Sequence, residues 1–497
     1  MRRMQKRHQT TVLSPAQTGK LNFDQSQLDA FSHAVVGRIV LPQDPSYNAD
    51  RQPFICAYHH YPQVIVYCMG KSDVLACLRF AKEVGLKVAV RAGGHSSAGY
   101  SINDEMVIDV SGIYYVNVNQ ESETAVVGGG AKFGQVYAEL DLYQMHIPGG
   151  GCETVSVGGY MQGGGYSFTS QMFGMNCDSV IGVQVALADG EIVRASADEN
   201  PDLFWAVRGG TGNNFGIVLE IEYKLRKLGQ IWGFGFKWPL TTDEQARSAS
   251  IAAAAWQENF TGPNIPSNFS AQSQLVYTKE TPDSDEPGPY FILRGMFNGT
   301  EEECREALQP LFDSAPNAEE RRDIWRSGNY TELNAYMFSY PTDIPLNVPL
   351  SSRSIAMSHI ADRFLTADEW RSLIDFYRNG RNTDNFVGLE GYGGAINQVA
   401  SDATAYWHRN ASIDIFFYAF WLRESDADGA RQCMEEFNRL VEPLSNGHSY
   451  QNYPARNLQG FGERYFGGNL PRLIEIKKKF DPDDLFAFEQ GLLNTEA

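Results

Sequence analysis

Two glycine-rich stretches dominate this sequence: Arg91-Ala92-Gly93-Gly94-His95-Ser96 and, downstream, Gly149-Gly150-Gly151-Cys152. The first places a histidine beside a glycine turn, and the second places a cysteine after three glycines. Because glycine lacks a Cβ atom, such turns let backbone N–H groups come close to a flat or phosphorylated ligand. A histidine and a cysteine beside two such turns indicate a cofactor that is attached covalently.

Glycine clusters recur at 93–94, 128–130, 149–151, 158–159, 163–165 and 209–210. One such cluster alone fits tight packing of a strand against a helix, but this density favours a backbone cradle for a diphosphate and a flavin ring. No cluster completes the G-x-G-x-x-G pattern of the Rossmann fold, and none completes the phosphate-binding loop. The sequence therefore disfavours both a Rossmann domain and phosphoryl transfer.

The composition limits the classes of function. The chain has 497 residues, 43% of them hydrophobic, which predicts two domains. A formal net charge of −19 argues against nucleic acid and anionic membranes as partners and favours small or neutral ligands. Seven cysteines without a C-x-x-C pair give no disulfide framework and no zinc signature, so no metal is expected. Residues 1–22 lack the apolar segment of a secretory signal, which predicts a cytoplasmic protein.

Short β-rich runs alternate with turns between residues 61 and 228. The strand-like runs are 64–67, 87–90, 106–109, 124–127, 180–187 and 217–223. Residues 72–84, between the first two runs, have the apolar spacing of a helix. Strand, helix, strand and glycine turn together indicate an α+β nucleotide-binding unit. Residues 1–55 are expected to form a poorly ordered leader and lead-in.

The pattern changes near residue 230, where glycine becomes sparse. Three capping boxes then each precede an amphipathic run, namely Thr241 to Glu244, Thr300 to Glu303 and Thr366 to Glu369. Strand-like runs lie at 290–297, 386–399 and 412–422, and 429–444 is a further helix candidate. On a strand over 412–422, one face would carry Asp414, Phe416, Tyr418 and Phe420. A large sheet covered by helices fits, with one face free for substrate.

The motifs resemble those of the berberine-bridge-enzyme-like FAD-linked oxidases. Residues 91–97 resemble the family's R-x-G-G-H-S loop, and 151–155 resembles its second attachment segment, with Glu153 where typical members have proline. Residues 205–210 and 214–218 match the end of the flavin-binding domain, and 404–409 resembles a substrate-domain element. The C-terminal signature is matched by 450–454, 465–466, Asn469, 472–473 and 480–482. The similarity spans about residues 55–490.

The resemblance implies an α+β, two-domain FAD-binding fold of the para-cresol methylhydroxylase type, with an antiparallel-sheet substrate domain covered by helices. We expect a leader at 1–55, an FAD-binding domain at 56–230, a substrate domain at 231–445, and a segment at 446–497 that completes the FAD domain. FAD would be attached through both His95 and Cys152. The other expected cofactor-binding residues are Arg91, Ala92, Gly93, Gly94, Ser96, Ser97, Val155, Gly158, Gly159, Gly163, Tyr166, Gly216, Ile217, Val218, Asn452 and Tyr453.

Oxidation of a C–OH group needs a base that takes the hydroxyl proton while hydride leaves for the flavin. A tyrosine has a reference pKa of about 10, so it needs a neighbouring group or the flavin to lower that value. In related alcohol and sugar oxidases the tyrosine of the Y-x-N-Y segment fills this role, which assigns Tyr450 as the base. Glu390 and Tyr392 lie two residues apart on a predicted strand and would point to one face. We expect Tyr392 to assist and Glu390 to contact substrate or act as a second base; the alternative is that both tyrosines only line the pocket.

The resemblance implies an oxidase that transfers hydride from a hydroxylated carbon to FAD, with O2 as acceptor and H2O2 as product. Its expected substrate is a sugar, an oligosaccharide or a glycosylated secondary metabolite, and its expected assembly is a monomer or homodimer. One alternative is a flavin dehydrogenase or oxidative cyclase that uses O2 poorly. A serine hydrolase is more distant, because residues 94–98 nearly match a nucleophile elbow but a predicted strand, not a helix, follows. A non-enzymatic flavin- or carbohydrate-binding protein is the last alternative.

Overall fold

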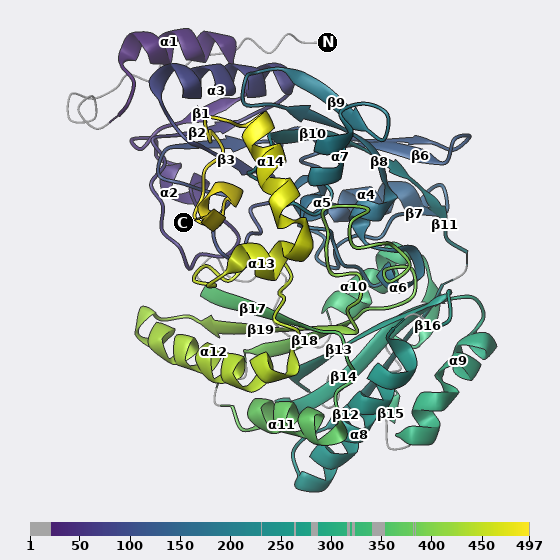
Figure 1. The fold of residues 1–497 in the computed structure, drawn as a ribbon. Coiled ribbons are helices and arrows are strands. Elements are labelled where there is room, and N and C mark those ends of the chain that lie inside the picture. The colour runs from purple at the N-terminus through teal and green to yellow at the C-terminus, as the bar shows by residue number, and fades with distance from the viewer. Residues whose placement is uncertain are drawn as a thin grey trace.

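The computed structural model describes residues 21–229, 231–262, 265–279, 287–315, 319–320, 324–339, 353–380, 382 and 384–496. Two halves are visible in Figure 1: the strands of residues 38–227 lie with the C-terminal helices in the upper half, and the strands of residues 231–421 form the lower half. Within the described ranges, no helix is both long enough and apolar enough to cross a membrane.

A four-stranded sheet begins the upper half, with the order β1-β2-β4-β3. Strands β2, β4 and β3 are parallel, and β1 joins β2 in antiparallel orientation. The bounds are β1 (Arg38–Val40), β2 (Val64–Tyr67), β3 (Val88–Arg91) and β4 (Met106–Asp109). Helix α3 (Lys71–Val84) connects β2 to β3 and ends at Gly85, whose positive φ of 70° suits glycine at a helix C-terminus.

The expected leader is wrong from residue 21 to residue 55. Helix α1 (Gln25–Ala34) packs on α3, where the rings of Phe31 and Phe80 stack with their centroids 4.1 Å apart. Strand β1 and the short helix α2 (Tyr47–Asp50) follow, and Val40 is buried. These apolar contacts make the segment part of the upper half, while residues 1–20 lie outside the described residues. The domain boundaries at residues 56, 231 and 446 stay a prediction.

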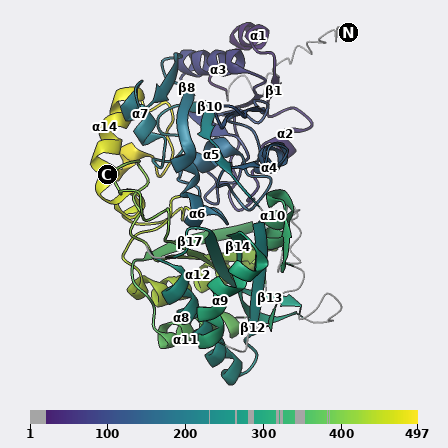
Figure 2. The same ribbon diagram turned by 90° about the vertical axis from the view of Figure 1, so that its right-hand side faces the viewer.

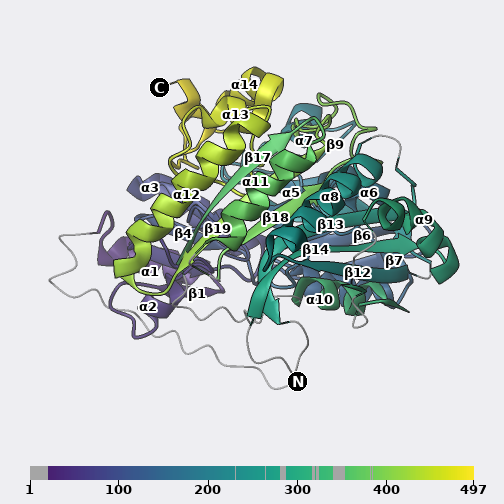
Figure 3. The same cartoon turned by 90° about the horizontal axis from the view of Figure 1, so that it is seen from below.

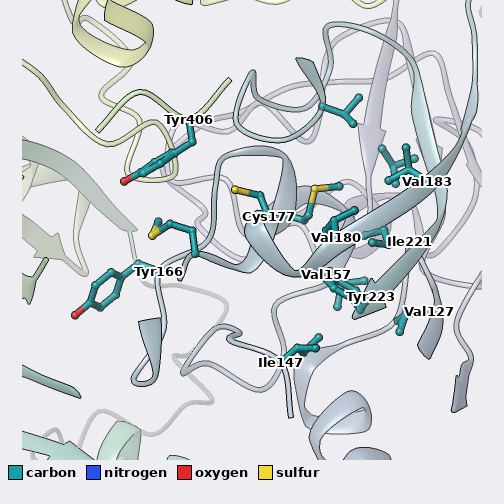
Figure 4. Packing of buried hydrophobic residues seen from close by; sticks show 14 of the residues in the cluster. Val127, Ile147, Val157, Tyr166, Cys177, Val180, Val183, Ile221, Tyr223 and Tyr406 are labelled. Atoms are coloured by element: carbon teal, nitrogen blue, oxygen red, sulfur yellow. The ribbon is translucent and has the colours of Figure 1, made fainter. Parts of the chain in front are cut away.

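A five-stranded antiparallel sheet completes the upper half, with the order β5-β6-β10-β8-β9. Its strands are β5 (Val116–Asn119), β6 (Thr124–Gly128), β8 (Val180–Ala186), β9 (Ile192–Ser196) and β10 (Ile217–Lys224), and β7 (Met145–His146) pairs separately with β11 (Arg226–Lys227). The helices around it are α4 (Phe133–Asp141), α5 (Val157–Gln162), α6 (Ser170–Phe173), η1 (Asn176–Ser179) and α7 (Pro201–Ala206). Figure 4 shows part of this core, where Val157 lies beside Val180, Ile221 and Tyr223.

A large antiparallel sheet forms the lower half, with the order β15-β12-β14-β13-β18-β19-β17, and β16 also pairs with β12. Its strands are β12 (Ile231–Pro239), β13 (Phe269–Lys279), β14 (Pro287–Asn298), β15 (Glu319–Glu320), β16 (Arg326–Gly328), β17 (Arg353–Ala361), β18 (Phe386–Gly391) and β19 (Ile413–Trp421). The predicted strand over 386–399 is wrong beyond Gly391. There the chain turns away through Gly393 and Gly394, whose φ angles of 131° and 52° do not suit a strand.

Helices cover one face of the large sheet, as seen from below in Figure 3. They are α8 (Asp243–Phe260), α9 (Glu301–Ser314), α11 (Ala367–Arg378) and α12 (Ala427–Val441), whereas α10 (Tyr330–Ser339) lies nearer the upper half. Val387, Leu389, Ile415 and Phe417 point into this helix-covered core. Because side chains alternate along a strand, the residues between them face the upper half. The expected face with Phe416, Tyr418 and Phe420 is therefore the one that looks toward the other half.

The C-terminal segment returns to the upper half. Helices α13 (Phe461–Phe466), η4 (Gly467–Asn469), α14 (Leu470–Phe480) and η5 (Leu492–Glu496) lie together, and Figure 2 shows α14 beside α7. The backbone N–H of Val88 donates to the carbonyl of Leu485 at 3.0 Å, and the Lys87 ammonium donates to the carbonyl of Asp484 at 2.6 Å. The last part of the chain is thus bonded to strand β3, which precedes the His95 loop.

Two of the three predicted capping boxes are confirmed. The Thr300 and Thr366 hydroxyl groups accept from the backbone N–H groups of Glu303 and Glu369. The first predicted box is displaced by one residue, because Thr242 rather than Thr241 caps α8 and pairs with Gln245. A glutamine fills this role as well as a glutamate, since it also accepts a hydrogen bond from the backbone.

We expect Thr366→Ala to lower the free energy of unfolding by about 1 kcal/mol, because the N–H groups at the start of α11 lose their capping oxygen. Urea denaturation followed by circular dichroism measures the change. Thr366→Ser is the matched control, since it keeps the capping hydroxyl group and should stay near the wild-type midpoint. An equal loss in both variants would contradict the capping explanation.

Candidate active site

A cavity of about 460 Å³ lies where the glycine-rich loops of the upper half meet the free face of the large sheet. Of the predicted residues for the cofactor, its wall contains His95, Cys152, Ala92, Gly93, Gly94, Ser96, Val155, Gly158, Gly159, Tyr166, Gly216, Val218, Asn452 and Tyr453. Strands β13, β14, β18 and β19 supply the opposite wall. The sequence motifs therefore converge on one chamber that both halves form.

Four predicted cofactor residues lie behind this wall. Arg91 forms an ion pair with Asp109 at 2.5 Å, and Ile217 is buried in the core. A Cβ on Gly163 would lie 2.0 Å from Asn452 Oδ1, so this glycine leaves room for Asn452. The Ser97 hydroxyl donates to the carbonyl of Pro454, and a turn rather than a helix follows it. In the near-match at 94–98 the nucleophile position is Ser96, and this turn rather than a helix follows it, which removes the support for a serine hydrolase.

His95 and Cys152 converge on one side chain in the cavity wall. The Thr154 hydroxyl lies 3.0 Å from His95 Nε2 and 3.3 Å from Cys152 Sγ. The His95 ring also stacks on Phe54, with the ring centroids 4.1 Å apart. Desolvation, together with the positive charge of Lys132, lowers the pKa of His95 to about 4. The imidazole is therefore neutral at neutral pH and keeps a nitrogen lone pair.

The two attachment loops touch because a glycine lies between them. A Cβ on Gly93 would lie 2.9 Å from the backbone nitrogen of Ser156 and 3.2 Å from the carbonyl oxygen of Thr154, so no larger residue fits without movement. The turn after Cys152 closes through a hydrogen bond from the Val155 N–H to the Cys152 carbonyl at 3.2 Å. Glu153 occupies the second position of this turn, which closes without the proline of typical family members.

Several buried polar atoms in the cavity wall have no hydrogen-bond partner among the described residues. These atoms are Tyr100 Oη, Ser101 Oγ, Gln162 Oε1 and Gln451 Oε1. A buried polar group without a partner is costly, so such atoms indicate a polar ligand. The backbone N–H groups of the cavity glycines are also accessible, because no side chain covers them. Both features fit a dinucleotide such as FAD, whose hydroxyl, phosphate and ring groups would form hydrogen bonds with these atoms.

Three N–H groups donate hydrogen bonds to the hydroxyl oxygen of Tyr450. The backbone N–H groups of Gly165 and Tyr166 donate to it at 2.9 and 3.1 Å, and Asn452 Nδ2 donates at 3.0 Å. The side chain is only 1% exposed. Burial and the charge of Glu390 raise the pKa of Tyr450, and the three donors oppose this shift. Because three donors occupy the oxygen, it has no free lone pair for a substrate proton.

Tyr453 is placed differently, because its hydroxyl donates to Glu390 Oε1 at 2.5 Å, the short distance of a charge-assisted O–H···O bond. Burial raises the pKa of Tyr453, and the charge of Glu390 raises it further. Tyr453 is half-buried and both partners line the cavity. Tyr392 does not line it, because its hydroxyl pairs with that of Tyr406 at 2.6 Å. The structure thus pairs the Glu390 carboxylate with the Tyr453 hydroxyl, and it pairs the Tyr392 hydroxyl with that of Tyr406.

Aromatic side chains of β18 and β19 form the wall beyond Tyr453. The ring of Phe416 stacks on Tyr453 with centroids 4.2 Å apart, and Phe386 stacks on Tyr418 at 5.3 Å. Phe420 continues this surface, with its ring 5.9 Å from that of Tyr418. Flat apolar rings with a few polar groups beside them suit a sugar ring or another planar substrate.

Several residues of this site have little or no signal in the sequence. Thr154 stands inside the quoted attachment segment, but nothing in its spacing indicates that it contacts both His95 and Cys152. Thr211 and Asn213 adopt positive φ angles of 65° and 60° in the cavity wall, and the preceding Gly-Gly pair was the available signal. No sequence pattern points to Phe54, which lay in the segment expected to be disordered.

Comparison with known proteins agrees with this geometry. A family model described as FAD binding domain matches residues 62–196, and one described as Berberine and berberine like matches residues 449–492. The chain is 27% identical to the uncharacterized FAD-linked oxidoreductase YgaK of Bacillus subtilis, over 92% of this chain and 97% of that protein. It is 27% identical to a carbohydrate oxidase of Microdochium nivale, over 91% of this chain and 92% of that protein.

A solved structure gives the same result for the fold. Wild-type BBE-like 1 of Physcomitrella patens superposes with a TM-score of 0.81 at 26% identity, over 94% of this chain and 98% of that one. The predicted fold class, with its FAD-binding half of the para-cresol methylhydroxylase type and its antiparallel sheet, is confirmed, as is the predicted family. The glycine-lined cavity, the C-terminal signature and these matches identify the chain as a berberine-bridge-enzyme-like, FAD-linked oxidoreductase.

Proposed function

We propose that the protein oxidises a hydroxylated carbon of a sugar, an oligosaccharide or a glycosylated secondary metabolite, with FAD attached through both His95 and Cys152. The main support for this proposal is that His95 and Cys152 both contact Thr154 in the cavity wall. FAD, when bound, would supply the hydride acceptor, and its reoxidation by O2 would give H2O2. The protein's own residues bind the substrate, orient it and remove its proton.

The neutral state of His95 supports attachment through that residue. With a pKa lowered to about 4, the imidazole offers a lone pair to an electrophilic ring substituent at neutral pH. Stacking on Phe54 and the contact with Thr154 fix the direction of the ring. Cys152 faces the same chamber from the other loop, so the two bonds would hold one cofactor from two sides.

The far wall supports a sugar-like substrate. Phe386, Phe416 and Tyr418 offer flat apolar surfaces, which suit the C–H face of a sugar ring. Gln272 and Gln274 of β13 also line this part of the cavity, and each amide can donate to and accept from hydroxyl groups. The carbohydrate oxidase among the relatives supports the same substrate class.

We assign the base to the pair of Tyr453 and Glu390 rather than to Tyr450 and Tyr392. As the hydride leaves the carbon, the substrate hydroxyl proton passes to Tyr453 Oη, and the proton of Tyr453 passes to Glu390 Oε1. The C–H and O–H bonds of the substrate are replaced by a C=O bond, and Tyr453 stays neutral throughout. The 2.5 Å contact supports this transfer, because the acceptor is already hydrogen-bonded to the proton it receives.

We expect yellow colour to stay with the protein after acid precipitation, because covalent flavin is not released by unfolding. His95→Ala and Cys152→Ala should each keep covalent flavin through the remaining bond, and the double variant should release all of it to the supernatant. Absorbance of pellet and supernatant measures this. Complete release from the wild-type protein would overturn the covalent attachment, and a protein that takes up no FAD at all would overturn the proposed function.

A further inference from the structure

Two buried carboxyl groups face each other across strands β18 and β19. Glu390 and Asp414 are register partners in this antiparallel pair, with exposures of 4% and 0%. Directly opposed side chains of this kind lie with their Cβ atoms about 5 Å apart, and two like charges there are destabilising. Two ionised carboxylates would therefore repel each other in a place largely shielded from solvent.

Each carboxyl group has one oxygen with a donor and one oxygen without. Glu390 Oε1 accepts from Tyr453, and Asp414 Oδ1 accepts from the Ser358 hydroxyl at 2.6 Å. The same hydroxyl also accepts from the backbone N–H of Tyr450 at 2.8 Å, which fixes its place. Among the described residues, Glu390 Oε2 and Asp414 Oδ2 have no partner. A proton bound to one of these two oxygens would make it a hydrogen-bond donor, and the other oxygen would be its acceptor.

No ion pair among the described residues offsets the repulsion between two ionised carboxylates at this place. In the part of the chain that the structure describes, no lysine or arginine forms an ion pair with either carboxyl group. The titratable side chains with which the pair interacts are tyrosines with raised pKa values, and hence neutral, namely Tyr160, Tyr166, Tyr392, Tyr406, Tyr418, Tyr450 and Tyr453. Burial raises the pKa of both carboxyl groups, that of Asp414 to about 7, and an ionised Asp414 would raise that of Glu390 further, so the two groups are not both ionised at neutral pH.

We propose that Glu390 and Asp414 hold one proton between them, and that Asp414 is a positioning residue that keeps Glu390 ionised and directed toward Tyr453. The second part rests on the proposed function, whereas the shared proton does not. Asp414 donates to Glu390 Oε2, which leaves Oε1 free to take the proton of Tyr453. After that step the pair holds two protons, and one must leave before the next turnover.

Infrared difference spectroscopy on the flavin-loaded protein at neutral pH counts these protons through the C=O stretch of a protonated carboxyl group. We expect Glu390→Gln and Asp414→Asn each to remove one such band, because the amide donates in place of the acid and the remaining carboxyl ionises. The double variant should remove no more than either single variant. Loss of two bands in the double variant, or of none in any variant, would overturn the shared proton. Labelling with ¹³C-aspartate identifies the contribution of Asp414.

A pair of matched variants tests the positioning role. Asp414→Asn keeps a donor for Glu390 Oε2 and should reduce flavin at nearly the wild-type rate with the oligosaccharide that best reduces the wild-type protein. Asp414→Leu has a similar size but no donor, so the pKa of Glu390 should rise and the rate at neutral pH should fall at least about tenfold, the effect of one pKa unit. The rate should recover as the pH is raised, because Glu390 then ionises.

The outcomes separate this inference from the proposed function. Equal rates and pH profiles for Asp414→Asn and Asp414→Leu would overturn the positioning role. If Asp414→Leu does not fold, the band count in Asp414→Asn and Glu390→Gln still decides the shared proton. If the bands behave as expected but Glu390→Gln reduces flavin normally, the shared proton stands and the assignment of Glu390 as proton acceptor fails.

Discussion

Glu390→Gln is expected to slow flavin reduction by substrate about 10²–10⁴-fold, the usual contribution of a general base. Glutamine keeps the size of the side chain and its contact with Tyr453, but it cannot take the Tyr453 proton. The cofactor side of the cavity is untouched, so flavin content should stay at the wild-type level. Anaerobic stopped-flow bleaching of the flavin measures the step directly, with an oligosaccharide that reduces the wild-type protein.

Two tyrosine variants give the matched comparison for this prediction. Tyr453→Phe should slow flavin reduction as strongly as Glu390→Gln, because it removes the hydroxyl that links substrate to carboxylate. Tyr450→Phe should act mainly on stability, at about 1–3 kcal/mol, because the N–H groups of Gly165 and Tyr166 lose their acceptor. The opposite result, with Tyr450→Phe inactive and Tyr453→Phe active, would restore Tyr450 as the base.

The largest expected effect on stability belongs to Arg409→Met, at about 3–5 kcal/mol. Arg409 is 1% exposed, and its two terminal nitrogens donate to both carboxylate oxygens of Asp178 at 2.6 and 2.7 Å. Burial disfavours the charge on Arg409, but Asp178 outweighs this and raises the pKa of the guanidinium group. Methionine fills the space and leaves Asp178 without its cation in a place that water reaches poorly.

Arg363→Met provides the control for Arg409→Met. Arg363 makes the same two-point contact with Glu369, at 2.7 and 3.0 Å, but its side chain is 45% exposed. An exposed pair contributes at most about 1 kcal/mol, because water solvates both charges after the substitution. Chemical denaturation of both variants should therefore show a much larger loss for Arg409→Met. Equal losses would contradict the role of burial in the Arg409–Asp178 pair.

The cofactor half could be predicted from the sequence because its signals are local. The His95 loop, the Cys152 turn and the strands on either side of α3 are short patterns whose geometry depends on glycine and on neighbouring residues. The capping threonines at 300 and 366 were predictable for the same reason, since the donor and acceptor lie three residues apart. The registers of the large sheet have no such local signal.

The proposed base rests on contacts between distant segments. Glu390 and Tyr453 are 63 residues apart in the chain, and nothing in the Y-x-N-Y segment tells which tyrosine reaches the carboxylate. The alternation that placed Glu390 and Tyr392 on one face requires a strand, and the strand ends at Gly391 between them. Likewise, the opposition of Glu390 and Asp414 follows from the register of β18 and β19, which the side-chain pattern alone does not fix.

The return of the C-terminal segment to the upper half has a consequence for how the protein is made. The Tyr450 oxygen is bonded to Gly165, 285 residues earlier, and the Asp484 carbonyl is bonded to Lys87, 397 residues earlier. The ribosome therefore adds several hundred residues between the two partners of each bond, and contacts of such long range form slowly. The cavity wall is completed only once residues 450–490 have joined the upper half, so we expect the cofactor to be captured late in folding rather than to act as a nucleus for it.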